Sequence, residues 1–124
     1  KAEKEATYHL RHAGEWVIRL GDGTPESRAR IVAALDALWR FTGELFHVEH
    51  AERALIEDGT LPDPAAIRAE WDATVSRVLS PATLERPRDG WMQTGGRRGV
   101  HTEHLGHMLA VMQHLQRAYP GATW

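Results

Sequence analysis

The residues best suited to chemistry in this sequence are its histidines and carboxylates. Eight of the 124 residues are histidine, and 17 are Asp or Glu. Carboxylate-bridged di-iron centres in helical bundles need a Glu-x-x-His pair on each of two helices and one further Glu on each of two others. Residues three or four apart share a helix face, so this spacing aims both ligands of a pair at one point.

One strict Glu-x-x-His pair is present, at Glu44 and His47, and the sequence holds no second strict copy. Looser Glu-x-x-x-His pairs occur at Glu5 and His9 and at Glu103 and His107. Glu44 also points well away from the apolar stripe of the helix on which we expect it. The ligand set for a di-iron centre is therefore incomplete within this chain.

Three histidines follow one another at intervals of three, at His101, His104 and His107. This spacing winds them slowly around a helix and does not aim them at one metal ion. We interpret the histidines as solvent-exposed or capping residues, with His9 as a hydrogen-bonded core residue. We assign no catalytic, cofactor-binding or metal-ligating residue and expect no cofactor. The alternative is a metal-binding bundle that combines the two looser pairs with carboxylates from further helices.

The glycine- and arginine-rich stretch from 85 to 99 is the other candidate for binding chemistry. Its segment Gly-Gly-Arg-Arg-Gly at 95–99 suits an anion, because guanidinium groups pair well with phosphate oxygens. It lacks the Lys-Ser/Thr ending of a P-loop and follows no predicted strand. We interpret it as a long surface loop.

Serine and tryptophan add less. Ser27, Ser76 and Ser80 have no neighbouring base that would make a nucleophile. Trp91 and Trp124 lie off every predicted apolar stripe, and aromatic residues of this kind are enriched at protein interfaces. For these two residues an interface role and a plain surface role both stay open.

The elements that must carry these residues are helices. Apolar residues recur at helical spacing in five segments, at about 2–20, 25–46, 48–57, 64–79 and 101–119. Glycines end the first, while Thr24 and Asp63 stand before prolines as N-caps of the second and fourth. Pro81 ends or kinks the fourth. The short turn at 21–24 makes the first two helices antiparallel neighbours.

The predicted inner stripes define how these helices should pack. They consist of His9, Ala13, Trp16, Val17 and Leu20; of Ile31, Leu35, Leu38, Thr42 and Leu45; of Ile67, Trp71, Val75, Val78 and Leu79; and of Leu105, Met108, Leu109, Met112 and Leu115. Long amphipathic helices favour an all-α helical bundle with one long loop. No domain boundary stands out, so residues 1–124 are expected to form one helical domain or part of one.

Composition narrows the function classes. A net charge of −2 with interspersed signs argues against a nucleic-acid surface, and no apolar run approaches the roughly 20 residues that span a membrane. The absence of cysteine excludes disulfides and thiolate chemistry and fits the cytoplasm. The first residues are helical in character without an N-cap, which suggests a fragment of something longer.

Several stretches together resemble a known family. They are Tyr-His-Leu-Arg-His-Ala at 8–13, Trp-Val-Ile-Arg-Leu-Gly-Asp-Gly-Thr at 16–24, Ala-Leu-Asp-Ala-Leu-Trp at 34–39, Thr-Gly-Glu-Leu-Phe at 42–46, His-Thr-Glu-His-Leu-Gly-His at 101–107 and the segment at 112–124. These resemble the C subunits of bacterial ring-1,2-phenylacetyl-CoA epoxidases, which are multicomponent monooxygenases of phenylacetate breakdown. The match runs in order over nearly the whole chain.

The resemblance implies a ferritin-like fold and a division of labour. A related A subunit would carry the di-iron centre and bind phenylacetyl-CoA, while the C subunit would be a structural partner without a working metal site. Residues 86–99 could then touch either a partner or the phosphates of CoA. By the same resemblance, family members are about twice this long, and this chain would correspond to their C-terminal half. We expect it to pair with an A-type subunit, and with another copy or the remaining half.

Overall fold

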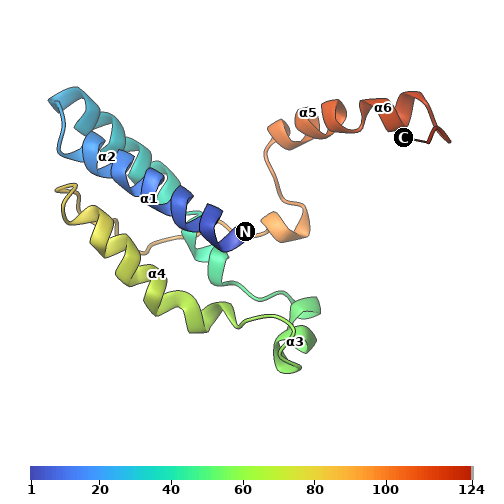
Figure 1. Cartoon of the computed structure of the whole chain (residues 1–124), viewed down its shortest axis with the longest axis horizontal. Helices are drawn as coiled ribbons and strands as arrows, with labels where there is room; N and C mark the ends of the chain where they lie inside the picture. Colours follow the sequence, from blue (N-terminus) through green and yellow to red (C-terminus); the bar gives the residue numbers. More distant parts are fainter. Residues whose placement is uncertain (124) are drawn as a thin grey trace. The chain divides into compact units, whose positions relative to one another are not determined.

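The computed structural model describes residues 1–123, and these residues form helices, turns and loops without a strand (Figure 1). The prediction of an all-α chain with long antiparallel helices, as in part of a ferritin-like bundle, is confirmed. The chain divides into two compact units, 1–93 and 94–124. The division falls inside the predicted loop 85–99. None of the described helices has the length and apolar content that crossing a bilayer requires.

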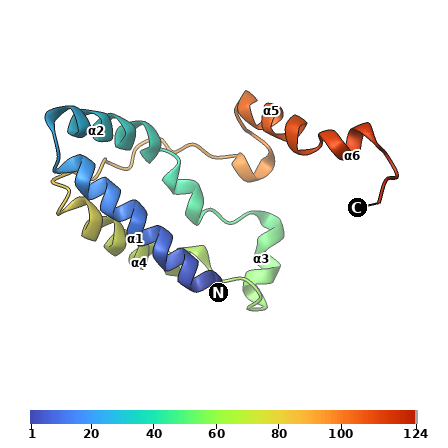
Figure 2. The same ribbon diagram turned by 45° about the horizontal axis from the view of Figure 1, so that its top comes forward.

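Three long helices make up most of the first unit: α1 (Ala2–Gly21), α2 (Pro25–Trp39) and α4 (Pro64–Leu79). Helix α1 packs against both α2 and α4 (Figure 2). Both predicted caps are confirmed. The Thr24 side chain accepts from Ser27 N at 3.2 Å, and Asp63 accepts from Ala65 N at 2.9 Å. These bonds satisfy amide groups that have no partner inside the helix, which fixes where α2 and α4 begin.

The predicted extent of the second helix is wrong. Helix α2 ends at Trp39, and a separate 3₁₀ helix, η1, covers Thr42–Phe46. The carbonyl of Trp39 accepts from Thr42 Oγ1 at 2.8 Å, and the carbonyl of Arg40 accepts from Gln93 N at 2.8 Å. These carbonyls are occupied by a side chain and by a distant loop, so the α-helical ladder stops here.

The short helix α3 spans His50–Glu57, two residues less than predicted. Its first turn is closed by a hydrogen bond from Glu49 N to Glu52 Oε2 at 2.8 Å. Helix α4 ends before Pro81, as predicted. A turn follows in which Thr83 has φ +56° and Leu84 N donates to Leu79 O at 3.0 Å. This turn brings Ala82 and Leu84 back onto the helices.

The core of the first unit lies under this turn. Leu79, Ala82 and Leu84 are buried there, with Val17 and Leu35 packed partly against them. Gly21 is buried at the same place. A Cβ at position 21 would lie 3.0 Å from Ala82 Cβ and 3.1 Å from Leu84 Cγ, and it would also meet the Ala82 carbonyl. Only a glycine lets α1 and the turn approach this closely.

The predicted stripes are partly wrong. His9 and Trp16 are exposed on α1, as are Leu38 on α2, Leu45 in η1 and Ile67 on α4. Helix α1 instead turns its glycine face inward, since a Cβ at Gly14 would lie 3.2 Å from Val78 Cγ2. Glycine carries no apolar side chain, so a stripe drawn from hydrophobic residues misses the side on which helices approach most closely.

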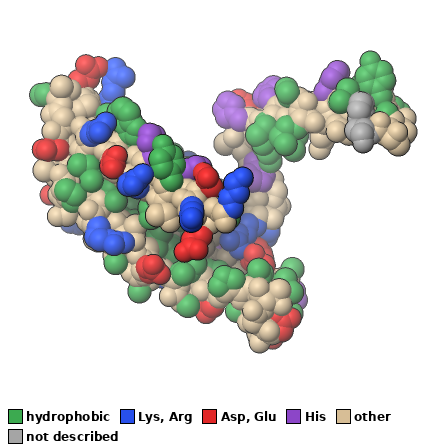
Figure 3. All heavy atoms as spheres, viewed as in Figure 1, with side chains coloured by type: hydrophobic (Ala, Val, Ile, Leu, Met, Phe, Trp, Pro, Cys, Tyr) green, Lys and Arg blue, Asp and Glu red, His purple; other side chains and the backbone are tan. Residues whose placement is uncertain are grey.

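The described part of the second unit contains η2 (Gly96–Arg98), α5 (Glu103–Met112) and α6 (His114–Ala118). The prediction of one helix over 101–119 is therefore wrong at Gln113, where the chain turns with φ −94° and ψ −1°. Of the predicted inner residues here, only Leu105 is half-buried. Apolar side chains lie uncovered along both helices (Figure 3). Without packing, a single long helix is only marginally stable in water.

Candidate functional site

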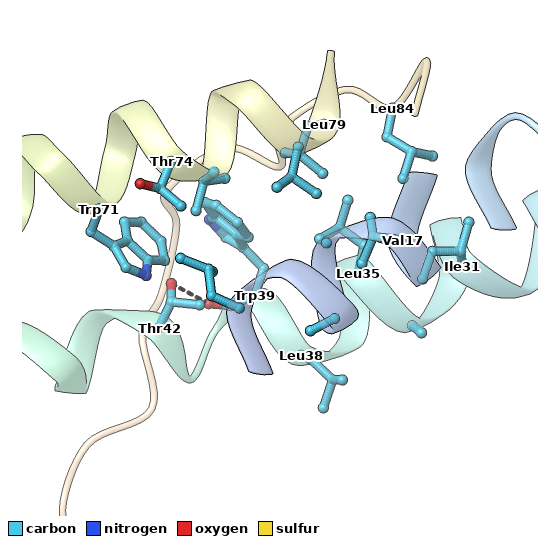
Figure 4. Close-up of a pocket in the computed structure, with 16 residues that line it drawn as sticks. Val17, Ile31, Leu35, Leu38, Trp39, Thr42, Trp71, Thr74, Leu79 and Leu84 are labelled. Atoms are coloured by element: carbon cyan, nitrogen blue, oxygen red, sulfur yellow. Dashed lines mark hydrogen bonds between the residues drawn. The ribbon is translucent and has the colours of Figure 1, made fainter. Parts of the chain in front are cut away.

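An apolar groove of about 400 Å³ lies within the first unit, open on one side. Helices α1, α2 and α4 form its walls, and their aliphatic and aromatic side chains point into it (Figure 4). It is lined by Leu10, Ala13, Gly14, Val17, Ile31, Ala34, Leu35, Leu38, Trp39, Thr42, Trp71, Thr74, Val75, Val78, Leu79 and Leu84. An uncovered apolar surface of this kind is typical of a site that another helix or protein covers.

The two hydroxyl groups in the groove are already engaged. Thr42 Oγ1 donates to the Trp39 carbonyl at 2.8 Å, and Thr74 Oγ1 accepts from Arg77 Nη2 at 2.7 Å. Small residues such as Ala13 and Gly14 leave room for close approach along α1. The groove can therefore bury apolar side chains, and among the described residues no acid, base or nucleophile lines it.

Aromatic rings close one end of the groove. The Trp71 ring lies 5.8 Å from that of Trp39 and 5.3 Å from that of Phe46, measured between centroids. Two guanidinium groups cover these rings: Arg68 lies 4.6 Å from the Phe46 centroid, and Arg86 lies 5.1 Å from the Trp39 centroid. Stacking of this kind favours arginine over lysine and fixes the orientation of the rings.

Carboxylates complete this cluster. Asp72 Oδ1 lies 2.9 Å from Arg86 Nη1, and Asp89 Oδ2 lies 3.2 Å from Arg68 Nη2. Trp39 Nε1 donates to Asp89 Oδ1 at 2.9 Å. All four charged side chains are between a third and a half exposed, so each ion pair stabilises only modestly. Their joint effect is to hold the segment after α4 against α2 and α4.

Sequence reasoning missed this cluster. Its members come from α2, η1, α4 and the loop after α4, so no helical period connects them. The one signal in the sequence was that the predicted loop contains Arg86 and Asp89, two residues of opposite charge. That signal does not identify their partners, because Trp39 and Asp89 are 50 residues apart.

The structure does not gather the predicted metal-ligand candidates. Glu5 Oε2 and His9 Nε2 are 4.0 Å apart, with 63% and 73% of their side chains exposed, so His9 is no core residue. His47 Nε2 lies 3.3 Å from Glu49 Oε1. Glu103 and His107 belong to α5, in the other unit. Within residues 1–123, no group of three or more His, Asp or Glu side chains is placed to hold a metal ion.

The remaining sequence candidates have local roles. Ser27 Oγ donates to the Leu20 carbonyl, and Ser76 Oγ donates to the Asp72 carbonyl, each at 2.9 Å. Gly95 has φ +103° and its carbonyl accepts from Val100 N at 2.9 Å, so the Gly-Arg stretch closes as a turn. Trp91 is 70% exposed. Trp124 lies outside the described residues.

Together these features define a helical protein with an apolar groove that can bury the side chains of another segment or protein. The chain belongs to the phenylacetic acid catabolic protein family, whose model matches residues 1–124. It is 49% identical, over all 124 of its residues, to the C subunit of 1,2-phenylacetyl-CoA epoxidase from Escherichia coli (strain K12). The chain spans 50% of that relative's length. The family resemblance is thus confirmed, and the assignment to a C-terminal half stays a prediction.

Proposed function

We propose that this chain is part of a C-type subunit of a 1,2-phenylacetyl-CoA epoxidase and serves phenylacetate breakdown in the cytoplasm. The observation that carries the proposal is the 49% identity to the Escherichia coli protein over every residue of the chain. A match of this extent leaves no segment of the chain outside the likeness. The chain spans half the length of that relative, so the activity of the whole protein is also proposed here.

The role proposed is structural. The subunit stabilises and orients an A-type subunit that carries the di-iron centre, and it performs no catalysis itself. The groove supports a structural rather than a catalytic role for this chain, because its lining is apolar and its hydroxyl groups are engaged within the chain. Such a surface contributes burial energy, at roughly 25 cal/mol per Å² of apolar area covered, and no chemistry.

The groove must be covered in the working protein. In our proposal the cover is supplied by the rest of a longer chain, which corresponds to the other half of the relative, or by a second copy. Exposed apolar faces of this extent normally associate.

Co-purification tests the proposal. The complete protein that contains this sequence is expressed with the A-type subunit of a phenylacetyl-CoA epoxidase, and the complex is isolated through a tag on one partner. We expect a stable complex and turnover of phenylacetyl-CoA that depends on both subunits. A well-folded protein that neither binds the A-type subunit nor changes its turnover would exclude the role.

The alternative, a metal-binding oxygenase subunit, predicts a different result. Protein purified in the presence of iron would then hold two equivalents of tightly bound metal, and Glu103→Ala would release it. Our proposal predicts that iron in the purified complex stays with the A-type subunit and is unaffected by Glu103→Ala.

A further inference from the structure

The segment from 85 to 93 has no regular structure, yet it is fixed along its length. Arg86 Nη1 lies 2.9 Å from Asp72 Oδ1, and Asp89 Oδ1 accepts from Trp39 Nε1 at 2.9 Å. Gln93 N donates to the Arg40 carbonyl at 2.8 Å. Charged and aromatic side chains and a backbone hydrogen bond therefore anchor this irregular segment to the end of α2 and to α4.

This anchored segment displays an exposed tryptophan. Trp91 is 70% exposed, although the residues on either side of it are held in place. Asp89 accepts a hydrogen bond from Trp39 at the end of α2, and Gln93 donates one to the carbonyl of Arg40, the next residue. The guanidinium of Arg40 lies 5.7 Å from the Trp91 ring centroid and 5.0 Å from that of Phe41. Tryptophan and arginine are among the residues most enriched where a few side chains dominate binding energy at interfaces. A side chain that is fixed before binding loses less entropy on association.

A hollow of about 150 Å³ lies beside Trp91. Its lining includes two arginines, Arg40 and Arg88, and one acid, Asp36. Among the described residues neither arginine has an ion-pair partner, whereas Arg68 and Arg86 in the same unit both do. The hollow therefore has a surplus of positive charge and guanidinium donors that are free to pair with a carboxylate.

We propose that the Trp91 hollow, defined by Arg40, Arg88 and Trp91, is a docking site for an acidic side chain on the surface of the A-type subunit. The aromatic ring would cover the contact while the arginines bind the carboxylate. This inference rests on the proposed function, because it takes the A-type subunit as the partner. Charge complementarity selects an acidic protein surface, and the size of the hollow suits one side chain rather than a helix.

The test compares variants of the complete protein by calorimetric titration with the A-type subunit. Trp91→Ala and Arg88→Glu should each raise the dissociation constant at least tenfold, and Trp91→Phe should restore most of the lost affinity. The effect of Arg88→Glu should shrink as salt rises, since screening weakens charge pairing. Arg30→Glu is the matched control, because Arg30 is also exposed but pairs with Glu26 within its own helix at 2.7 Å.

The outcomes separate the two proposals. If the unmodified protein does not bind the A-type subunit, the proposed function and this inference both fail. If it binds, but Trp91→Ala and Arg88→Glu bind equally well, only the docking site is wrong. A lowered melting temperature with unchanged affinity would overturn it too, by showing that the protein's own chain covers Trp91. Binding of CoA alone that Arg88→Glu abolishes would assign the hollow to a ligand instead.

Discussion

Residues 1–93 and residues 94–123 are built from the same material, amphipathic helices joined by glycine-rich turns, but only the first set has a core. In the first unit Leu79, Ala82 and Leu84 are buried, and aromatic and charged side chains hold a loop in place. In the described part of the second, large apolar residues such as Val111 and Met112 remain 78% and 65% exposed. Apolar content alone therefore does not give a helix a core.

The difference shows what makes a helix stable in this protein. Helix α5 is the more apolar in composition, yet it breaks after ten residues, whereas α4 continues for 16. Helical periodicity provides a face, but burial of that face provides most of the stability. Substitutions should therefore have large effects where a face is covered and small effects where it is not.

The largest effect is expected at Trp39. This side chain is 6% exposed, contacts Trp71 and Arg86, and donates to Asp89. Trp39→Ala should lower the free energy of unfolding by about 3 kcal/mol, measured in urea. Trp39→Phe keeps the ring contact but loses the hydrogen bond and should cost about 1 kcal/mol.

The counterpart in the second unit is Val111→Ala, which should change the unfolding free energy by less than about 0.5 kcal/mol. Equal losses for Trp39→Ala and Val111→Ala would contradict the comparison, because they would show that α5 is covered as thoroughly as α2.

Two glycines sharpen the comparison, since the same substitution should act with opposite sign. Gly21→Ala places a Cβ against Ala82 and Leu84 and should destabilise by about 1–3 kcal/mol through overpacking. Gly106→Ala on α5 meets nothing within 4 Å and should stabilise its helix by about 0.5–1 kcal/mol through lower chain entropy. Urea midpoints and helical circular dichroism of both variants provide the measurement. A loss at Gly106 would mean that its face is packed.

The sequence predicts the features of this molecule that depend on neighbouring residues, and it fails where distant residues are in contact. Local signals succeeded: Thr24 and Asp63 cap the helices that they were expected to cap. Predictions failed where a distant residue decides. The predicted second helix runs past Trp39 because nothing near residue 40 shows that Gln93 occupies the Arg40 carbonyl. The Trp39–Asp89 link likewise depends on residues 50 positions apart and requires the folded chain.

The smallest expected effect is on the pKa of Asp58, which depends, like the helix caps, on a residue close by in the sequence. At the end of α3, Thr60 donates from its side chain and its backbone N–H to Asp58, and these bonds lower the pKa of Asp58 below 3.8. A lowered folded-state pKa stabilises the fold above the unfolded pKa, and this contribution is lost as the pH falls through the folded value.

Carboxyl titration by NMR should therefore show that the pKa of Asp58 is lower than that of an ordinary aspartate. Thr60→Ala removes the hydroxyl and should raise the Asp58 pKa, though not fully, because the backbone N–H of residue 60 still donates at 2.9 Å. Thr60→Ser should leave it low. The lowered pKa should also persist in Trp39→Ala as long as α3 stays folded, because no core residue contributes to it. A return of the Asp58 pKa to the ordinary value in that variant alone would show that even this turn depends on the packed core.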